Sequence, residues 1–197
     1  MKKTVAIFGS SGGIGAATRQ QFLDAGYTVI PVSRNLIDFA GTNAEFQIQE
    51  FLSLSTPDVV VNCVGKFSTN DEPAGPTMNI NFNSNWAIVQ HYLKNPQPVR
   101  IIMVGSSASK AGKKDYMVYS ASKAALLNLW QGAKDAFADT KVVIDLVNPV
   151  RTRTRMVAPF NDNLDYLAPE DVAKWIINLD QSNDPSRCVD ITFKDAK

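Results

Sequence analysis

The chain has 197 residues, of which 45% are hydrophobic and 20% are charged, a composition typical of one globular domain with a sizeable core. Its formal net charge of +1 argues against broad electrostatic binding to nucleic acid or to a membrane surface. No apolar run approaches the roughly 18 residues of a membrane span, and the run after Lys2 and Lys3 is too short for a secretion signal. We therefore expect no nucleic-acid or membrane partner.

The cysteine and histidine content argues against a disulfide framework or a metal centre. Cys63 and Cys188 lie far apart and belong to no CxxC or Cys/His group, so we expect reduced, buried thiols in a cytoplasmic protein. His91 is the only histidine and has no companion for a metal site, so we expect a surface or core role for it.

The first elements predict the opening of a dinucleotide-binding unit. The run Thr4–Phe8 favours a buried strand, residues 16–25 favour a helix, and Thr28–Val32 favours a second strand. Between the first strand and the helix lies the turn Gly9-Ser10-Ser11-Gly12-Gly13-Ile14-Gly15. Glycines let backbone amides approach a phosphate closely, and the helix that follows adds its positive dipole end.

The rest of the chain predicts further strand and helix units. There is room for a brief strand near Ile37 and a helix over residues 43–54. Buried strands follow at 58–61, 99–104 and 142–147. The segment 164–180 favours a last helix with Pro169-Glu170-Asp171 at its start, and 188–193 favours an edge strand. This order predicts an α/β fold, a single doubly wound parallel-sheet (Rossmann-like) domain with helices on both faces, spanning 1–197. A short substrate loop is expected at about 150–163.

A candidate proton-transfer site lies at the start of a predicted helix over 119–137. Tyr119 and Lys123 are four residues apart, so on a helix they share one face. A phenol loses its proton near pH 10, and a nearby ammonium lowers that pKa. Ser106, at the end of the preceding strand, is placed to hold a substrate oxygen. The alternative is that Tyr119 and Lys123 only form part of a solvated helix face.

Two widely separated motifs give the chain a resemblance to the short-chain dehydrogenase/reductase family. These are Gly9-x-x-x-Gly13-x-Gly15 and Tyr119-x-x-x-Lys123, and the resemblance extends over nearly the whole chain. Further similar segments are Asn62-Cys63-Val64-Gly65, the asparagine cluster Asn79, Asn81 and Asn83, and Asn148-Pro149-Val150, where the family has glycine in place of valine.

The resemblance implies the roles of four catalytic residues in an NADP(H)-dependent carbonyl reductase or alcohol dehydrogenase. Tyr119 would give a proton to the carbonyl oxygen while Ser106 holds it, and Lys123 would lower the tyrosine pKa and bind the nicotinamide ribose. Asn81 would hold a water molecule for proton return. Ser106 is preferred over Ser107 because it lies thirteen residues before Tyr119. The neighbours of Asn81 leave its register open.

The resemblance also assigns the cofactor contacts. They are Gly9, Ser10, Ser11, Gly12, Gly13, Ile14, Gly15, Ser33, Arg34, Asp38, Asn62, Val64, Gly65, Tyr119, Lys123, Pro149, Val150, Thr152 and Thr154. A carboxylate at the end of the second strand would bind the adenosine ribose and repel a 2′-phosphate. This chain instead has Ser33 and Arg34 there, whose hydroxyl and guanidinium suit that phosphate, so NADP(H) is preferred over NAD(H). The alternative is an ordinary exposed arginine. Asp38 resembles the aspartate that contacts adenine.

Cations near the expected substrate loop suggest an anionic substrate. Arg151, Arg153 and Arg155 alternate, so in an extended segment they would converge. Lys110, Lys113 and Lys114 lie between Ser106 and Tyr119, beside the same mouth; the alternative is that they are simply solvated. The candidate substrate residues are Ser107, Lys113, Arg151, Arg153 and Arg155. This region is also similar to reductase domains associated with ribitol-phosphate cytidylyltransferases, which implies a sugar or polyol phosphate.

Several alternatives stay open. Tyr116 would pack or line the substrate site. The apolar residues Leu126, Leu127, Leu129 and Trp130 either pair two subunits in a homodimer or homotetramer or form an intrachain core stripe. The alternatives to a reductase are a regulatory protein that binds NADP(H) without turnover and an epimerase or dehydratase that uses bound cofactor transiently.

Overall fold

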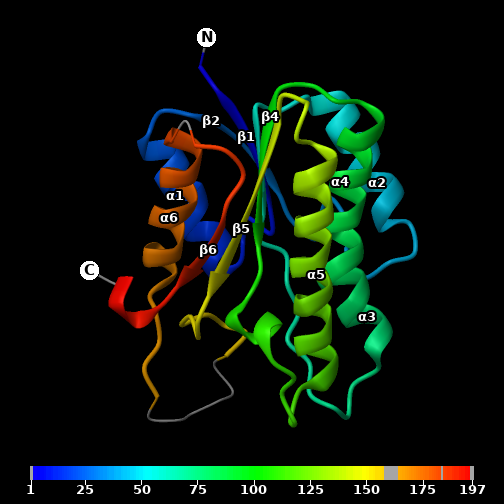
Figure 1. The fold of residues 1–197 in the computed structure, drawn as a ribbon, viewed down its shortest axis with the longest axis vertical. Coiled ribbons are helices and arrows are strands. Elements are labelled where there is room, and N and C mark those ends of the chain that lie inside the picture. Colours follow the sequence, from blue (N-terminus) through cyan, green and yellow to red (C-terminus); the bar gives the residue numbers. More distant parts are fainter. Residues whose placement is uncertain (1, 158–163, 183, 196–197) are drawn as a thin grey trace.

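The computed structural model describes residues 2–157, 164–182 and 184–195, which form one six-stranded parallel sheet in the order β2-β1-β3-β4-β5-β6 (Figure 1). Its strands are β1 (Thr4–Phe8), β2 (Thr28–Val32), β3 (Val59–Asn62), β4 (Val99–Val104), β5 (Val142–Pro149) and β6 (Cys188–Ile191). The predicted Rossmann-like parallel sheet is therefore confirmed.

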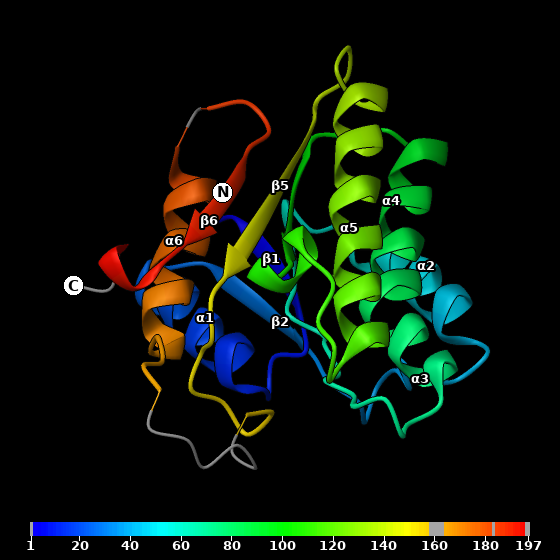
Figure 2. The ribbon, with the colours of Figure 1, turned by 60° about the horizontal axis from the view of Figure 1, so that its bottom comes forward.

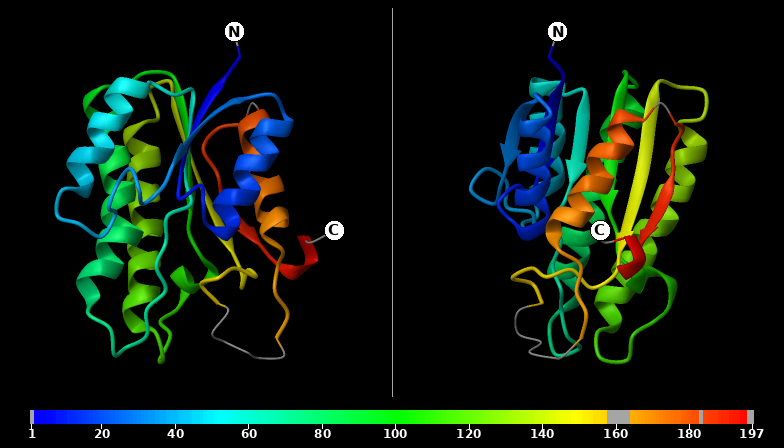
Figure 3. Two further views of the ribbon diagram at one scale, coloured as in Figure 1. Left: turned by 180° about the vertical axis from the view of Figure 1, so that it is seen from behind. Right: turned by 90° about the vertical axis from the view of Figure 1, so that its left-hand side faces the viewer.

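Helices cover both faces of the sheet, as Figures 1 and 3 show. On one face lie α1 (Gly13–Asp24) and α6 (Pro169–Gln181), and on the other lie α2 (Ala44–Ser55), α4 (Ser84–Lys94) and α5 (Met117–Ala136). The shorter elements are α3 (Ala74–Met78), a π-helical turn at Asn79–Asn83, and 3₁₀ turns at Ser107–Lys110 and Phe193–Asp195. No helix in the described part of the chain is long and apolar enough to cross a membrane.

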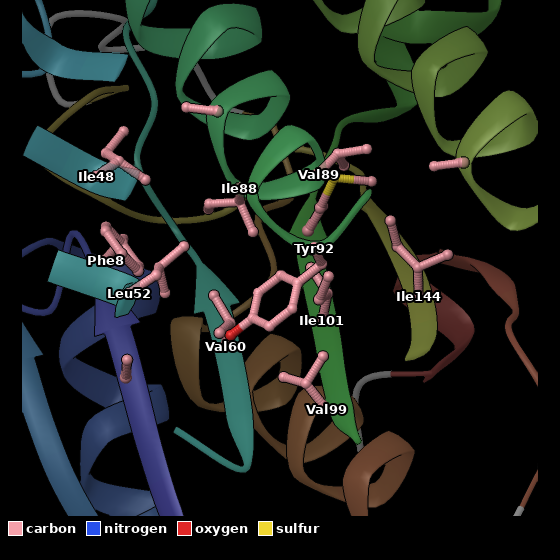
Figure 4. Close-up of a cluster of buried hydrophobic side chains, with 14 of the residues drawn as sticks. Phe8, Ile48, Leu52, Val60, Ile88, Val89, Tyr92, Val99, Ile101 and Ile144 are labelled. Carbon is pink, nitrogen blue, oxygen red and sulfur yellow. The ribbon is translucent and has the colours of Figure 1, made fainter. Parts of the chain in front are cut away.

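The central strands are apolar because both of their faces are covered by helices. Every residue of β3 and β4 is buried, as expected for strands inside a parallel sheet. On the side of α4, the fully buried Tyr92 packs among Val60, Ile101 and their neighbours (Figure 4). This packing holds the carboxyl ends of the strands in fixed positions, and the candidate site lies at those ends.

The prediction of a brief strand near Ile37 is wrong. Residues 33–43, all described, form turns and bends. The backbone amides of Leu36 and Ile37 both donate to the carbonyl oxygen of Ser33, at 3.0 and 3.1 Å, instead of joining a sheet ladder. Ile37 and Phe39 are buried because they pack into the hydrophobic core beside β2. Strand β2 is consequently the edge of the sheet.

Some helices and strands begin or end a few residues away from their predicted boundaries. The first helix begins at Gly13, directly in the glycine turn, and the helix of Tyr119 begins at Met117. The last helix begins at Pro169, as predicted, because proline suits a first helical position and Ala168 before it is extended. The final strand ends at Ile191, short of the predicted boundary.

Three expectations about side chains inside the fold have separate outcomes. Both cysteines are free, but Cys188 is exposed, so the prediction of buried thiols is wrong for it; it lies on the edge strand β6. His91 is a core residue, 4% exposed. Leu126 and Trp130 are buried in the core on which Leu127 and Leu129 also pack, so the apolar surplus of this helix is used within the chain.

Candidate active site

The candidate site lies at the edge where all the parallel strands end, seen from that edge in Figure 2. The glycine turn follows β1, residues 63–65 follow β3, Ser106 follows β4, and residues 150–157 follow β5. Ligands of open parallel sheets bind at this edge. The sequence motifs singled out above therefore meet in one place.

The glycine turn presents the start of α1 to this edge. Gly9 has a φ of +76°, and a Cβ at Gly15 would lie 2.1 Å from the carbonyl oxygen of Gly9, so only glycine fits there. The amides of Gly9 and Ser10 donate to the Val32 carbonyl at 2.8 and 3.3 Å. Because no side chain caps the helix at Gly12, its first amides suit a phosphate.

The segment after β5 lies across the same edge. A Cβ at Gly13 would lie 2.7 Å from Cγ2 of Thr154, and one at Gly65 would lie 3.5 Å from Cε of Met156. The Thr152 hydroxyl is mostly buried and donates to the Val150 carbonyl at 3.0 Å. Of the two predicted threonines, Thr154 is thus the one beside the glycine turn.

The structure brings Ser106, Tyr119 and Lys123 together. Ser106 lies close enough to Tyr119 for its hydroxyl to lower the pKa of the phenol. Nζ of Lys123 lies 6.0 Å from the Tyr119 ring centroid, so the two residues share one face of α5. Ser107 is exposed at the start of a 3₁₀ turn and makes no comparable contact with Tyr119.

Burial sets the protonation of this group. It lowers the pKa of Lys123 to about 8, and the ammonium donates to the Val104 carbonyl at 3.0 Å. Burial also raises the pKa of Tyr119; the Ser106 hydroxyl lowers it in part and the charge of Tyr116 raises it further. The net shift of the Tyr119 pKa is upward because desolvation is its largest cause, and the predicted lowering by Lys123 stays a prediction.

Asn148 and Gly105 position Ser106, a role that the sequence analysis missed. The Asn148 side-chain oxygen accepts the Ser106 amide at 3.1 Å. A Cβ at Gly105 would lie 2.1 Å from that same oxygen, so glycine is required there. The Ser106 hydroxyl in turn accepts the Ala108 amide at 3.1 Å. The available signal was an asparagine at the end of a strand beside the serine strand.

Among the three asparagines of the π-helical turn, only Asn81 reaches the site. Its side chain accepts the Lys66 amide at 2.7 Å and donates to the Lys66 carbonyl and to the Ser122 hydroxyl, both at 2.9 Å. Both amide hydrogens are therefore used, so a water molecule can be bound only at the side-chain oxygen or the backbone. Asn79 instead donates to the Ala40 carbonyl at 3.1 Å, and Asn83 donates to Asn79.

The Asn62 side chain is used for internal structure. It is 1% exposed, donates to Ser84 at 3.1 Å and to Asn85 at 2.9 Å, and accepts the Val64 amide at 3.0 Å. This network fixes the turn from β3 toward Gly65. A cofactor contact at Asn62 can thus involve only its backbone.

The residues after β2 lie at the open edge of the sheet. Ser33 is half-buried, and Arg34 and Asp38 are exposed. The Asp38 carboxylate accepts the Ala40 amide at 3.2 Å. Within the described ranges, Arg34 has no recorded carboxylate partner, so its guanidinium is available to a ligand.

The predicted convergence of the arginines is wrong for the first two. The Arg151 guanidinium lies 5.9 Å from the Phe193 ring centroid, and that of Arg153 lies 5.9 Å from the Tyr166 ring centroid. The two rings belong to different segments, and a bridge between Thr152 and Leu167 separates the arginines. Arg155 is exposed. Residues 158–163 of the predicted substrate loop lie outside the described residues.

The lysines between Ser106 and Tyr119 do not flank the same mouth. Lys110 forms an ion pair with Asp190 on β6. Together with Lys113 and Lys114 it lines a cavity of about 510 Å³ whose floor includes the following residues of α5: Met117, Ser120, Ala121 and Ala124. At about 100° per residue these positions lie on the side of α5 opposite Tyr119 and Lys123. This cavity does not support the substrate role of Lys113, which stays a prediction.

Comparison with known proteins finds similar chains. A family model described as short chain dehydrogenase matches residues 51–165. An uncharacterized oxidoreductase, YvrD, of Bacillus subtilis (strain 168) is 25% identical over 95% of this chain and 83% of its own. A 3-oxoacyl-[acyl-carrier-protein] reductase of Bos taurus is 26% identical over 83% of this chain and 81% of its own.

Solved structures share the fold. A short chain dehydrogenase from Burkholderia cenocepacia J2315 in complex with NADP has a TM-score of 0.82 at 19% identity, covering 98% of this chain and 90% of its own. A 4-hydroxyisoleucine dehydrogenase complexed with NADH has a TM-score of 0.82 at 18% identity, covering 100% of each chain.

Proposed function

Because the chain belongs to the short-chain dehydrogenase family of oxidoreductases, we propose that it interconverts a carbonyl compound and an alcohol with NADP(H), using Tyr119 as general acid and base. The observation that supports this most directly is that Ser106 acts on the Tyr119 phenol while Lys123 lies on the same helix face as Tyr119, 6.0 Å from its ring centroid. These groups lie at the strand edge that also carries the uncapped glycine turn. Such a set serves proton transfer beside a bound dinucleotide.

In the proposed reduction, Tyr119 is the proton donor. A raised pKa keeps its phenol protonated at neutral pH, as a general acid requires. Ser106 would hold the carbonyl oxygen within reach of that phenol. When bound, NADPH supplies the hydride for the carbonyl carbon. The phenolate left behind would be stabilised by the Lys123 ammonium, which a pKa of about 8 leaves largely charged at pH 7.

The residues of the cleft fit a dinucleotide phosphate. The free amides at the start of α1 suit the pyrophosphate, with Thr154 nearby. Solved structures of similar fold hold NADP in one case and NADH in another, so the preference for NADP(H) rests on Ser33 and Arg34. A hydroxyl and a free guanidinium suit the 2′-phosphate.

Substitution of Arg34 tests this preference. Arg34→Asp is expected to weaken NADPH binding about tenfold while leaving NADH binding within about twofold, because only NADPH carries the 2′-phosphate. Arg19→Asp, which changes an exposed arginine on α1, is the matched control. Equal losses for both cofactors in Arg34→Asp would refute the assignment. Titration of protein fluorescence with each cofactor gives the affinities.

The proposed substrate is a small polar or anionic carbonyl compound or alcohol, for which sugar and polyol phosphates are one class. Exposed arginines at 151, 153 and 155 next to the cleft support an anionic group. Product formation without net change in nicotinamide absorbance would instead favour an epimerase or dehydratase. NADPH binding with no turnover of any carbonyl compound would favour a regulatory protein.

We also propose a cytoplasmic homodimer or homotetramer. Two free cysteines agree with a reducing compartment. The exposed face of α5 carries Ala121 and Ala124, small residues that permit close approach of a second helix. Light scattering after gel filtration measures the subunit number, and a monomer at micromolar concentration would refute the assembly.

Tyr119→Phe tests the mechanism. It keeps the ring and removes only the hydroxyl, so turnover of carbonyl compounds is expected to fall about 10²- to 10⁴-fold while NADPH affinity is retained. Tyr27→Phe removes another partly buried hydroxyl, which donates to the Asp180 carboxylate on α6, and serves as control. A Tyr119→Phe protein as active as the wild type would refute the assigned acid.

A further inference from the structure

Three aromatic rings meet at the candidate acid. The ring centroid of Phe67 lies 5.1 Å from that of Tyr116 and 5.1 Å from that of Tyr119, and the two tyrosine centroids are 6.0 Å apart. Phe67 comes from the segment after β3, and both tyrosines come from the start of α5. The sequence analysis did not single out Phe67, because nothing local marks it.

These rings are not part of the hydrophobic core. Phe67, Tyr116 and Tyr119 are each only half-buried, and none of them belongs to the two buried clusters of the fold. Together they leave a partly exposed aromatic surface at the carboxyl edge of the sheet. An exposed apolar surface beside a reactive group is characteristic of a ligand site. We call Phe67 and Tyr116 the aromatic wall.

The backbone around the aromatic wall is held by side chains that span the two segments. Asn81 binds both the amide and the carbonyl of Lys66, next to Phe67. The Asn70 side chain donates to the Lys114 carbonyl at 2.7 Å and accepts the Met117 amide at 2.9 Å. The segment of Phe67 is thereby fixed against the start of α5. A wall fixed before ligand binding contributes to selectivity.

Resting on the function proposed above, we propose that the aromatic wall determines specificity and selects carbonyl compounds whose carbonyl carbon bears a flat aromatic group. When a substrate carbonyl oxygen accepts a hydrogen bond from the Tyr119 hydroxyl, the substituent on the carbonyl carbon lies next to the rings that surround Tyr119. An aryl group conjugated to the carbonyl is rigid and planar, so it stacks with little loss of entropy. A flexible aliphatic chain must be ordered first and gains less.

The reaction balances with NADPH as the reductant. Hydride passes from NADPH to the carbonyl carbon, a proton passes from Tyr119 to the carbonyl oxygen, and the products are the arylmethanol and NADP⁺. Tyr119 then regains its proton from solvent. Phe67 and Tyr116 exchange neither protons nor electrons, so their effect is on substrate binding and is expected mainly in KM.

The test compares two small anionic aldehydes, 4-carboxybenzaldehyde, which is flat, and succinic semialdehyde, which is flexible. The wild type is expected to favour the first by about tenfold in kcat/KM, a factor within the range of aromatic stacking. Phe67→Leu and, as a second variant, Tyr116→Leu should lower kcat/KM for the flat aldehyde about fivefold or more and change the flexible one less than twofold. Tyr116→Phe should keep the preference because it keeps the ring.

The matched control is Phe46→Leu, because Phe46 lies on α2 and is 69% exposed. It should leave both aldehydes unchanged. Equal losses for both aldehydes in Phe67→Leu, or a wild type that prefers succinic semialdehyde, would overturn the aromatic wall and leave the proposed reductase intact.

A binding measurement separates the two proposals further. In the presence of NADP⁺, the wild type should bind 4-(hydroxymethyl)benzoate, and Phe67→Leu should weaken that binding about fivefold. Binding that depends on Phe67 without reduction of any aldehyde would contradict the reductase and support the wall. Absence of both binding and reduction would overturn both. Calorimetry gives the affinity, and thermal unfolding shows whether each variant is folded.

Discussion

Lysines lie on both sides of α5, buried on one side and beside solvent on the other. On the inner side, Lys123 is 4% exposed, and its ammonium donates to a backbone carbonyl beside Tyr119. On the solvent side, Lys113 and Lys114 line an open cavity with the first residues of the helix. The surroundings, and not residue type, decide what a lysine does here, since Lys123 lies on α5 and Lys113 and Lys114 lie in the connection before it.

The buried position of Lys123 carries a free-energy cost that the exposed lysines do not have. Burial lowers the Lys123 pKa from 10.5 to about 8, which corresponds to on the order of 3 kcal/mol against the charged form. The described residues provide no ion pair for Lys123 that would offset this. A surface ion pair such as Lys110–Asp190 costs little and contributes little. A charge kept at such cost is consistent with the proposed stabilisation of a phenolate.

The largest expected effect is on turnover. Lys123→Met should lower kcat about 10²-fold or more, because the phenolate formed at Tyr119 loses the ammonium beside it. Lys113→Met and Lys114→Met should stay within about twofold of the wild type, since they face the other side of α5. Initial rates with saturating NADPH give the comparison. Comparable losses in the three variants would show that the two sides do not differ in function.

The second effect is on the pH dependence of stability. The unfolded chain holds the Lys123 proton up to about pH 10.5 and the folded chain only to about pH 8. Between these values the unfolded state binds more protons, so the cost of burial is fully present below pH 8 and fades as the pH rises toward 10.5. Lys123→Met carries no such cost at any pH.

Relative to Lys123→Met, the wild type should therefore gain about 2 kcal/mol of unfolding free energy between pH 7 and pH 10. Urea unfolding at the two pH values measures this gain. Lys113→Met, as control, should show almost none, because its ammonium is solvated in both states. A difference between wild type and Lys123→Met that does not change with pH would contradict the burial of a charged lysine.

The features of the site that were predictable are those encoded over a few residues. The glycine turn and the Tyr119–Lys123 spacing depend on neighbours in sequence, and the structure brings both to one edge. The predicted strand near Ile37 is absent, although Ile37 and Phe39 are both buried and have the spacing of two residues that is typical of a strand. The backbone amides of Leu36 and Ile37 show the difference, because both donate to the carbonyl oxygen of Ser33 and not to a neighbouring strand.

Contacts between distant segments were beyond sequence reasoning. Asn148 binds the Ser106 amide from 42 positions away, and Asn70 binds Met117 from 47 positions away. Which asparagine meets which amide depends on strand order and on the path of each loop. The surroundings of the lysines between Ser106 and Tyr119 depend for a related reason on the path of their loop, which lines a cavity with the first residues of α5.

The smallest expected effect concerns the solvent side itself. Lys110 and Asp190 are both largely exposed, with side chains 54% and 44% accessible, so water and salt screen their attraction. Lys110→Ala should change the unfolding free energy by less than about 1 kcal/mol, and the change should shrink in high salt. A double-mutant cycle with Asp190→Ala isolates the pair. A coupling energy between Lys110 and Asp190 well above about 1 kcal/mol would mean that their ion pair fixes the cavity-lining loop. The two sides of α5 would then differ in the exposure of their lysines and not in how firmly the lysines are held.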